Sequence, residues 1–168
     1  MAVGRVLLLV LLMIVTLTSA KNSLQCTRQA DELTVTNGGS VFLPCSFNWT
    51  GPSPEVCRVV WKKEVKGGDP LVVHTRDRKT ENKNQGSEFV GRTALAADWF
   101  ERRDAALNLT GVSVRDTGTY ECHIVTQRPH NSENCAAVTL SVATDAAEIT
   151  TLPSMLLIAG LALVPFFS

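Results

Sequence analysis

One seven-residue motif in the second half of the chain constrains the fold most: Asp116-Thr-Gly-Thr-Tyr120-Glu-Cys122. A tyrosine stands two residues before a cysteine, and successive side chains of a β-strand alternate between its two faces. Both side chains therefore point to the same, inner face if this segment is a strand. The motif therefore fixes which residues of that strand face inward. Cys45 and Trp61, which lie upstream, are interpreted with that strand as the reference.

The spacing of the motif resembles the tyrosine corner of strand F in immunoglobulin domains, where the phenol hydroxyl bonds back to nearby backbone. Such a domain also has a cysteine in strand B and a tryptophan in strand C, and Cys45 and Trp61 stand in that order. The resemblance implies a Cys45–Cys122 disulfide with Trp61 packed against it. No helical period of 3.6 persists inside the domain. We therefore expect an all-β fold, an immunoglobulin-like (V-type) two-sheet Greek-key sandwich.

Short runs of alternating apolar residues, separated by turn residues, indicate where the strands lie. Two loops are expected, between strands B and C and between strands F and G, and a polar stretch after strand C′ is expected to hold a short C″ edge. Additional strands between C and D are typical of the variable type. The expected strands are 33–35 (A′), 41–47 (B), 59–63 (C), 71–74 (C′), 88–95 (D), 106–109 (E), 120–124 (F) and 138–142 (G); the loops are 48–57 and 127–134, and the polar stretch is 75–87.

Both ends of the chain are apolar and inflate its hydrophobic content of 45%. A positive start, an apolar run and small residues before Lys21 predict a cleaved signal peptide over residues 1–20, in preference to an N-terminal membrane anchor. The V-type domain is then expected over residues 21–143. This route leads through the secretory pathway to the external face of the plasma membrane.

The C-terminal tail, residues 155–168, is apolar but short. As a helix it reaches about 20 Å, against roughly 30 Å of hydrocarbon. Small residues, a spacer over 144–154 and an apolar end are the order of a glycosylphosphatidylinositol attachment signal. We expect a lipid anchor attached at Asp145 or Ala146; a marginal single span and a truncated gene model are the alternatives.

Five cysteines leave three outside the pair that the immunoglobulin resemblance implies. Cys26, Cys57 and Cys135 are all expected at one end of the sandwich. We favour a Cys26–Cys135 disulfide, because the first strand can lie beside strand G, which leaves Cys57 free or available to a second chain. Cys57–Cys135 and Cys26–Cys57 remain alternatives. A metal site lacks the Cys-x-x-Cys spacing that would support it.

Two Asn-x-Ser/Thr sequons predict N-glycosylation at Asn48 and Asn108. Asn48 begins the loop after strand B. Asn108 points outward between inward Leu107 and Leu109 if strand E alternates. A glycan on Asn108 would partly cover the sheet that contains strand E and direct partner binding to the other sheet.

The sequence offers no basis for catalysis. The histidines, His74, His123 and His130, form no known catalytic motif, and no phosphate-binding glycine loop is present. The formal net charge is zero, which gives no electrostatic case for nucleic acid. We therefore expect no enzyme, no cofactor and no metal. In variable-type domains a carboxylate at the position of Asp116 recurrently pairs with an arginine at the base of strand D, which here is Arg92.

Further segments resemble the butyrophilin, myelin-oligodendrocyte-glycoprotein and T-cell co-signalling ligand branch of variable domains. They are residues 41–46, 60–63, 89–95, 98–100 and 106–122. Members of that branch usually add a constant-type domain, a transmembrane helix and a cytoplasmic tail. Their binding surface lies mainly on strands G, F, C and C′. Carried onto this chain, the resemblance implies partner-binding candidates at Arg58, Val60, Lys62, His123, Val125, Gln127, Arg128 and His130.

The sequence therefore predicts a membrane-anchored recognition module that binds a cell-surface protein, as an immune co-signalling or adhesion ligand. One alternative is an accessory subunit of a membrane protein in the same bilayer, which a linkage through Cys57 would favour. Another is a homophilic adhesion protein, which would associate with itself.

Overall fold

The computed structural model describes residues 23–144, apart from residues 28, 78–79, 82–83 and 129. The strands in chain order are β1 (Ser23–Gln25), β2 (Gln29–Thr36), β3 (Ser40–Leu43), β4 (Asn48–Thr50), β5 (Val56–Lys63), β6 (Leu71–Asp77), β7 (Thr93–Leu95), β8 (Leu107–Thr110), β9 (Gly118–Gln127) and β10 (Asn131–Ala143). Three short helices join them: η1 (Ser87–Phe89), α2 (Trp99–Arg102) and η2 (Val114–Asp116). The predicted signal peptide, the spacer beyond residue 144 and the apolar tail lie outside the described residues.

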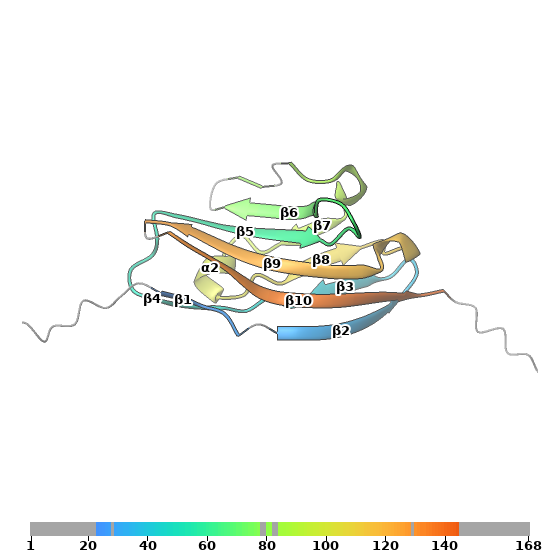
Figure 1. The fold of residues 1–168 in the computed structure, drawn as a ribbon, viewed down its shortest axis with the longest axis horizontal. Helices are drawn as coiled ribbons and strands as arrows, with labels where there is room; N and C mark the ends of the chain where they lie inside the picture. The colour runs from blue at the N-terminus through green and yellow to red at the C-terminus, as the bar shows by residue number, and fades with distance from the viewer. Residues whose placement is uncertain (1–22, 28, 78–79, 82–83, 129, 145–168) are drawn as a thin grey trace, which may run out of the picture.

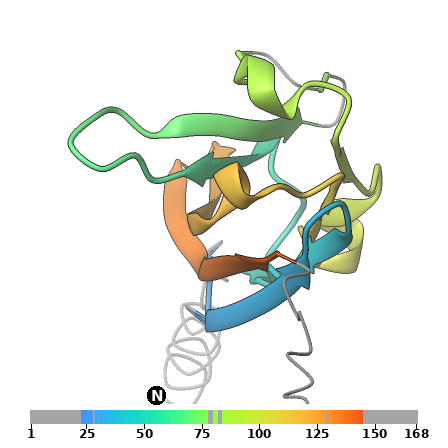
Figure 2. The ribbon, with the colours of Figure 1, turned by 90° about the vertical axis from the view of Figure 1, so that its right-hand side faces the viewer.

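Two sheets face each other across the core. The front sheet has the strand order β2-β10-β9-β5-β6, and Figure 1 looks onto it. The back sheet has the order β3-β8-β7, and the end-on view in Figure 2 shows the two sheets enclosing the core. β2 runs parallel to β10, whereas the other neighbours within the two sheets are antiparallel. The all-β, two-sheet sandwich predicted from the sequence is confirmed.

The core forms where the inward side chains of both sheets meet. On β5 the buried residues Cys57, Val59 and Trp61 alternate with outward ones. On β8 Leu107 and Leu109 are fully buried, as the predicted alternation requires. Burial of such side chains contributes about 1.5–3 kcal/mol each, so this alternation fixes which face of each strand is left for binding.

Strand B is shorter than predicted. Pro44 has no backbone N–H to donate to the ladder, and β3 ends at the preceding residue. In the rest of the predicted strand, residues 44–47, the chain forms one isolated bridge, Ser46 with Asp104. The expected B–C loop then contains β4, which pairs with β1 in a separate two-stranded sheet.

The predicted strand D over residues 88–95 is wrong in its first half. Residues 87–89 form η1, which buries Phe89, and strand pairing begins only at Thr93. No C″ strand is present among the described residues of 75–87; β6 instead extends to Asp77 and meets the next segment at one bridge, Arg76 with Glu81. The helix α2, too short for a sequence period, places Trp99 and Phe100 in the core.

Candidate functional site: the front-sheet face

The outward side chains of β5 and β9 form the middle of the front-sheet face. Their register pairs Arg58 with Val125, Val60 with His123, and Lys62 with Glu121. Arg58 is exposed, whereas Val60, His123 and Val125 are half-buried. The strands therefore place five of the predicted binding candidates side by side, with an apolar and imidazole centre between charged residues.

A shallow hollow of about 240 Å³ opens beside this centre, over β5 and β6. Arg58 and Val60 form one wall. The opposite wall comes from residues of β6 and the segment after it that the sequence analysis did not select: Val72, Thr75, Asp77, Thr80 and Asn84. A bulge in the β5–β6 pairing between Trp61 and Lys62 shifts the register of β6. Because of this bulge, simple alternation along β6 does not predict which of its side chains line the hollow, and Thr80 and Asn84 lie beyond β6.

A hydrogen-bonded group lies on the β9–β10 side of the face. The carboxylate of Glu121 accepts from Asn134 Nδ2 at 2.7 Å and lies 3.1 Å from His123 Nε2. Asn134 Oδ1 is covered and has no hydrogen-bond partner among the described residues. Glu121 thus holds His123 toward β10, and leaves Val60 and Val125 as the apolar part of the centre.

The remaining predicted candidates lie at the end of the face where β9 meets β10. Gln127, Arg128 and His130 are exposed. Arg128 adopts a left-handed backbone conformation, φ 52°, and its guanidinium donates to Glu55 at 2.8 Å. This pair bridges the β9–β10 turn to the loop before β5.

The predicted F–G loop over residues 127–134 is wrong in extent. β9 continues to Gln127 and β10 begins at Asn131, so only residues 128–130 separate the two strands. Residues 131–134 are polar, but their backbones pair with β9 from Asn131 opposite Thr126 onward. Backbone hydrogen bonds do not need apolar side chains, and a sequence pattern based on hydrophobicity misses such a strand.

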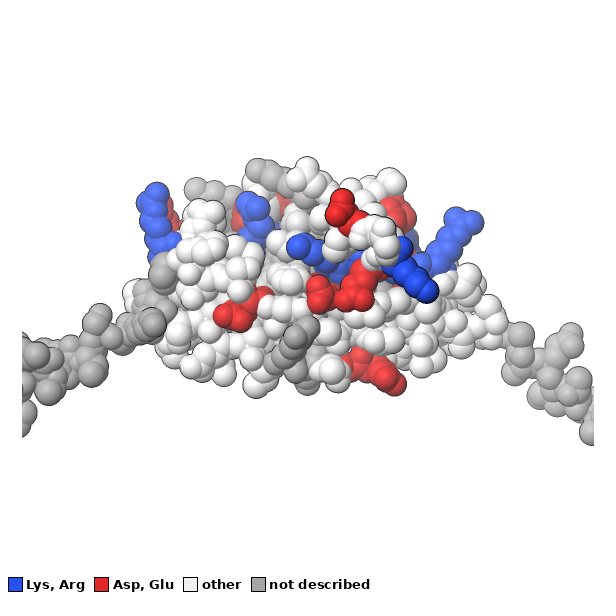
Figure 3. Space-filling model, viewed as in Figure 1, with Lys and Arg blue, Asp and Glu red and all other residues white. Residues whose placement is uncertain are grey.

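Charges on the face are mixed rather than of one sign. Figure 3 shows acidic and basic side chains interspersed on this face, several of them side by side, with broad uncharged surface elsewhere. The charged residues that border the centre, Arg58, Lys62 and Glu121, are of both signs. This arrangement suits recognition of a protein surface, and gives no continuous basic track for a nucleic acid.

A part-buried brace lies at the opposite end of the domain. Arg92 donates two hydrogen bonds, of 2.9 and 2.8 Å, to the carboxylate of Asp116. The same carboxylate accepts from the backbone N–H of Ser113 at 2.7 Å, and Tyr120 donates its hydroxyl to the Asp116 carbonyl at 2.7 Å. Burial alone would raise the pKa of Asp116, but the bonds from Arg92 and Ser113 outweigh it and the pKa is lowered. Asp116 is a structural carboxylate.

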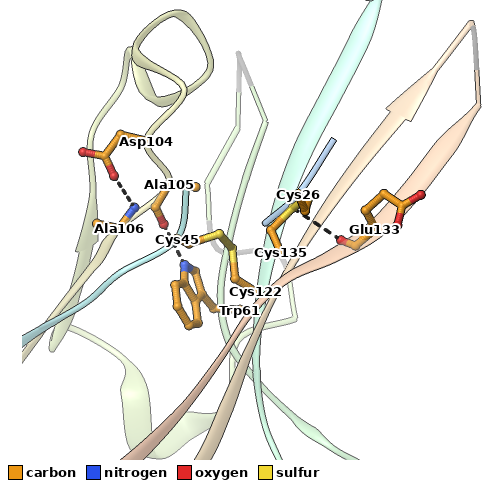
Figure 4. Close-up of a disulfide and its surroundings, with 9 residues drawn as sticks. All are labelled: Cys26, Cys45, Trp61, Asp104, Ala105, Ala106, Cys122, Glu133 and Cys135. Carbon is orange, nitrogen blue, oxygen red and sulfur yellow. Dashed lines mark hydrogen bonds between the residues drawn. A yellow bond between two sulfur atoms is a disulfide. The ribbon is translucent and has the colours of Figure 1, made fainter. Parts of the chain in front are cut away.

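Two disulfides hold the domain together, and Figure 4 shows both. Cys45 and Cys122 join the two layers, and Trp61 beside them donates its indole N–H to the Ala105 carbonyl at 2.9 Å. Cys26 and Cys135 tie the segment between β1 and β2 to β10. The structure thus has the pairing that the sequence analysis favoured among its three alternatives.

Cys57 belongs to neither disulfide. Its side chain faces inward from β5 and is 1% exposed. In this conformation Cys57 is covered, so it is not available to a second chain, which the sequence analysis had considered.

The three histidines do not converge. His74 is fully buried, with Nδ1 2.9 Å from Thr93 Oγ1, whereas His123 lies on the face and His130 is exposed. Within the part of the chain that the structure describes, no group of three His, Cys, Asp or Glu side chains could hold a metal ion.

The two sequon asparagines lie on different strands. Asn48 is exposed at the start of β4, and Asn108 is half-buried on the outward side of β8. The expected anchor residues Asp145 and Ala146 lie outside the described residues. Over the described range, 23–144 with its gaps, no helix has the length and hydropathy needed to cross a bilayer.

The two facing sheets, the disulfide between them and the tyrosine corner define an immunoglobulin-type sandwich. The immunoglobulin V-set domain family matches residues 28–143, and the chain belongs to this family.

Similar curated proteins include a T-cell activation inhibitor and a tapasin-related protein. Human V-set domain-containing T-cell activation inhibitor 1 is 34% identical over 107 residues, which are 60% of this chain and 36% of that protein. Human tapasin-related protein is 32% identical over 102 residues, 61% of this chain and 20% of that protein. The chain thus spans only a minor part of the length of these relatives.

Solved structures give the same fold. The IgV-like domain of human B7-H4 aligns with a TM-score of 0.51 and 27% identity, over 73% of this chain and 96% of that one. A chain from the crystal structure of ICOS in complex with ICOS-L and an anti-ICOS-L VNAR domain aligns with a TM-score of 0.57 at 21% identity, over 68% of this chain and 55% of that one. At that identity the second likeness shows the fold alone.

Proposed function

We propose that this protein is a membrane-anchored immune co-signalling or adhesion ligand that binds a cell-surface protein through the front-sheet face. The observation that carries the proposal is the centre of that face, where Val60, His123 and Val125 lie together beside the hollow. Similarity to a V-set T-cell activation inhibitor supports an immune-regulatory role.

The composition of the face fits a transient protein contact. Specific interfaces combine an apolar centre with a polar rim. Here the half-buried valines supply the centre, and Arg58, Lys62 and Glu121 border it. Such small faces bind weakly one at a time, and display of many copies on opposed membranes strengthens the contact.

Export through the secretory pathway and attachment by a lipid at Asp145 or Ala146 complete the proposal. The order of apolar and small residues at both ends of the sequence supports this route. The same route would add N-glycans at Asn48 and Asn108. The accessory-subunit alternative would be favoured by a linkage through Cys57, and the burial of Cys57 does not support that linkage.

The full chain, displayed on cells, tests the proposal against an array of cells that each express one surface protein. Adhesion to a specific array member is the expected result. Adhesion only between cells that both display this chain would instead indicate homophilic adhesion, and no adhesion to any array member would contradict the proposal.

A further inference from the structure

The outer face of the back sheet is exposed and carries no charged side chain on its paired outward positions. These positions are Ser40 and Phe42 on β3, Asn108 and Thr110 on β8, and Ala94 on β7. β3 and β7 are the edge strands of this sheet. Edge strands commonly carry charged side chains that discourage pairing with other chains, and the paired outward positions of this sheet lack them.

Phe42 is 69% exposed, more than any other large apolar side chain in the part of the chain that the structure describes. Its Cα partner across the ladder is Asn108, and Asn108 is flanked on the other side by Ala94. Directly opposed residues have Cβ atoms about 4.5–5.5 Å apart. The aromatic ring and the sequon asparagine are thus immediate neighbours on an open surface, with a small residue beyond.

Asn108 is half-buried. Its carboxamide oxygen is covered and has no hydrogen-bond partner among the described residues. A sugar attached to the carboxamide nitrogen would begin within one side-chain length of the Phe42 ring. The slightly positive C–H groups on one face of a pyranose suit the negative face of an aromatic ring.

We propose that the first N-acetylglucosamine of a glycan on Asn108 packs on the ring of Phe42 and covers the back sheet. The glycan is then a structural part of the domain, and the back sheet is closed to protein partners. This inference rests on the proposed secretory route, because N-glycans are added only there.

A second copy of this chain is the competing occupant of the surface. A stable interface buries at least about 1,000 Å² in total. The back sheet offers one phenylalanine among small side chains, and a sugar on Asn108 would stand in the middle of such an interface. The geometry therefore favours the sugar.

The test compares the full chain, made in cells that produce only high-mannose glycans, with its F42A, N108Q and doubly substituted variants. Phe42 is exposed, so F42A is expected to fold. Endoglycosidase H trims each glycan to a single N-acetylglucosamine, and thermal unfolding is followed by tryptophan fluorescence. We expect N108Q to lower the midpoint by about 3 °C in the presence of Phe42, and by less than about 1 °C in the F42A background.

Two matched controls are available in the same chain. Asn48 lies opposite Gln25 instead of an aromatic residue, so the effect of N48Q should be the same with and without Phe42. V90A removes another exposed apolar side chain, 64% exposed, which lies outside β3 and β8, the strands that contain Phe42 and Asn108, and it should not couple to N108Q.

Glycopeptide mass spectrometry separates failure of the route from failure of the contact. Absence of sugar at both sequons would contradict the secretory route itself, whereas sugar at Asn48 alone would overturn only this inference. A glycosylated protein in which N108Q has the same effect with and without Phe42 would also overturn it. So would a glycosylated dimer that F42A dissociates, since the second copy would then be the occupant.

Discussion

Arg92 and Asp116 show how a single pair of side chains can fix the end of a sandwich. Two hydrogen bonds of 2.9 and 2.8 Å join them, and the Asp116 side chain is only 4% exposed. The residue pattern predicted the pair because the family uses it. The bonds from Ser113 to the same carboxylate were not predictable, since they depend on the 3₁₀ turn η2.

Replacing Asp116 with Asn should lower the free energy of unfolding by about 2–3 kcal/mol at pH 7, because Arg92 loses its charged partner. The pKa of Asp116 is lowered in the fold, so its stabilising effect is present above the unfolded pKa, near 3.9, and is lost as pH falls through the folded pKa. Denaturant unfolding at several pH values should show the difference between D116N and the natural protein shrinking below about pH 4.

The exposed pair Arg128–Glu55 provides the control for this prediction. Its side chains are 81% and 60% exposed, and E55Q should cost less than about 1 kcal/mol. An equal cost for D116N and E55Q would contradict the structural role of the brace.

At the scale of elements, β6 and β7 are linked by a polar network. His74 Nδ1 is 2.9 Å from Thr93 Oγ1, and Gln85 donates to the same oxygen at 2.7 Å. His74 Nε2 lies 3.1 Å from the carboxylate of Glu81, which also pairs with Arg76. This network takes the place of the predicted C″ strand, and connects the front sheet to the back sheet at their edges.

Burial lowers the pKa of His74, as does the charge of Arg76, while Glu81 opposes the shift. The unfolded chain therefore binds the proton more readily, and stability should fall as pH drops below the unfolded pKa near 6.5. The free energy of unfolding, measured from pH 7.5 to 5, should decline more steeply in the natural protein than in H74Q. H130Q, altered at an exposed histidine, should keep the natural slope; identical slopes in all three proteins would contradict this account.

The Cys26–Cys135 disulfide holds β1 and β4 at one end of the sandwich. Replacing both cysteines with serine should raise amide hydrogen exchange in β1 and β4 while β5 and β9 stay protected. Replacing Cys45 and Cys122 instead should reduce protection across both sheets, since that bond joins the layers. Uniform loss of protection in the first variant would contradict a local role.

Strong alternation of apolar residues made β5, β8, β9 and β10, the predicted strands C, E, F and G, predictable. Burial on one face of a strand dictates a period of two. The elements that were missed lack that signal. β4 and the start of β10 are mostly polar or short, η1 interrupts the expected strand D, and α2 is shorter than two helical turns. The outward residues of the candidate site could be predicted once the strand register was known. The hollow could not, because it depends on a bulge in the β5–β6 pairing that the sequence pattern does not indicate.

At the scale of the molecule, the two sheets have different surfaces. The front sheet has a half-buried apolar centre bordered by both charges, and the back sheet has an uncharged face beside a sequon. The described chain begins at β1 and ends after β10, at opposite ends of the sandwich in Figure 1. In the proposed arrangement, an anchor that follows β10 leaves the β1 end farthest from the membrane.

A lipid anchor predicts that phosphatidylinositol-specific phospholipase C releases the displayed protein from cells. The released form should lack the apolar tail by mass spectrometry, since attachment at Asp145 or Ala146 removes it. Changing both residues to bulky ones should abolish surface display. Protein that stays on the membrane with its tail intact would instead indicate a membrane span.

Binding by the front-sheet face is the central claim, and Val60 tests it most directly. V60R places a charge at the centre of the face, while V90R makes the same change at an exposed valine outside it. Adhesion of cells displaying each variant to cells expressing the identified partner is the measurement. The account predicts at least a tenfold loss of adhesion for V60R, which corresponds to about 1.4 kcal/mol or more of binding free energy. It predicts no loss for V90R. Unchanged adhesion by correctly folded V60R would contradict it.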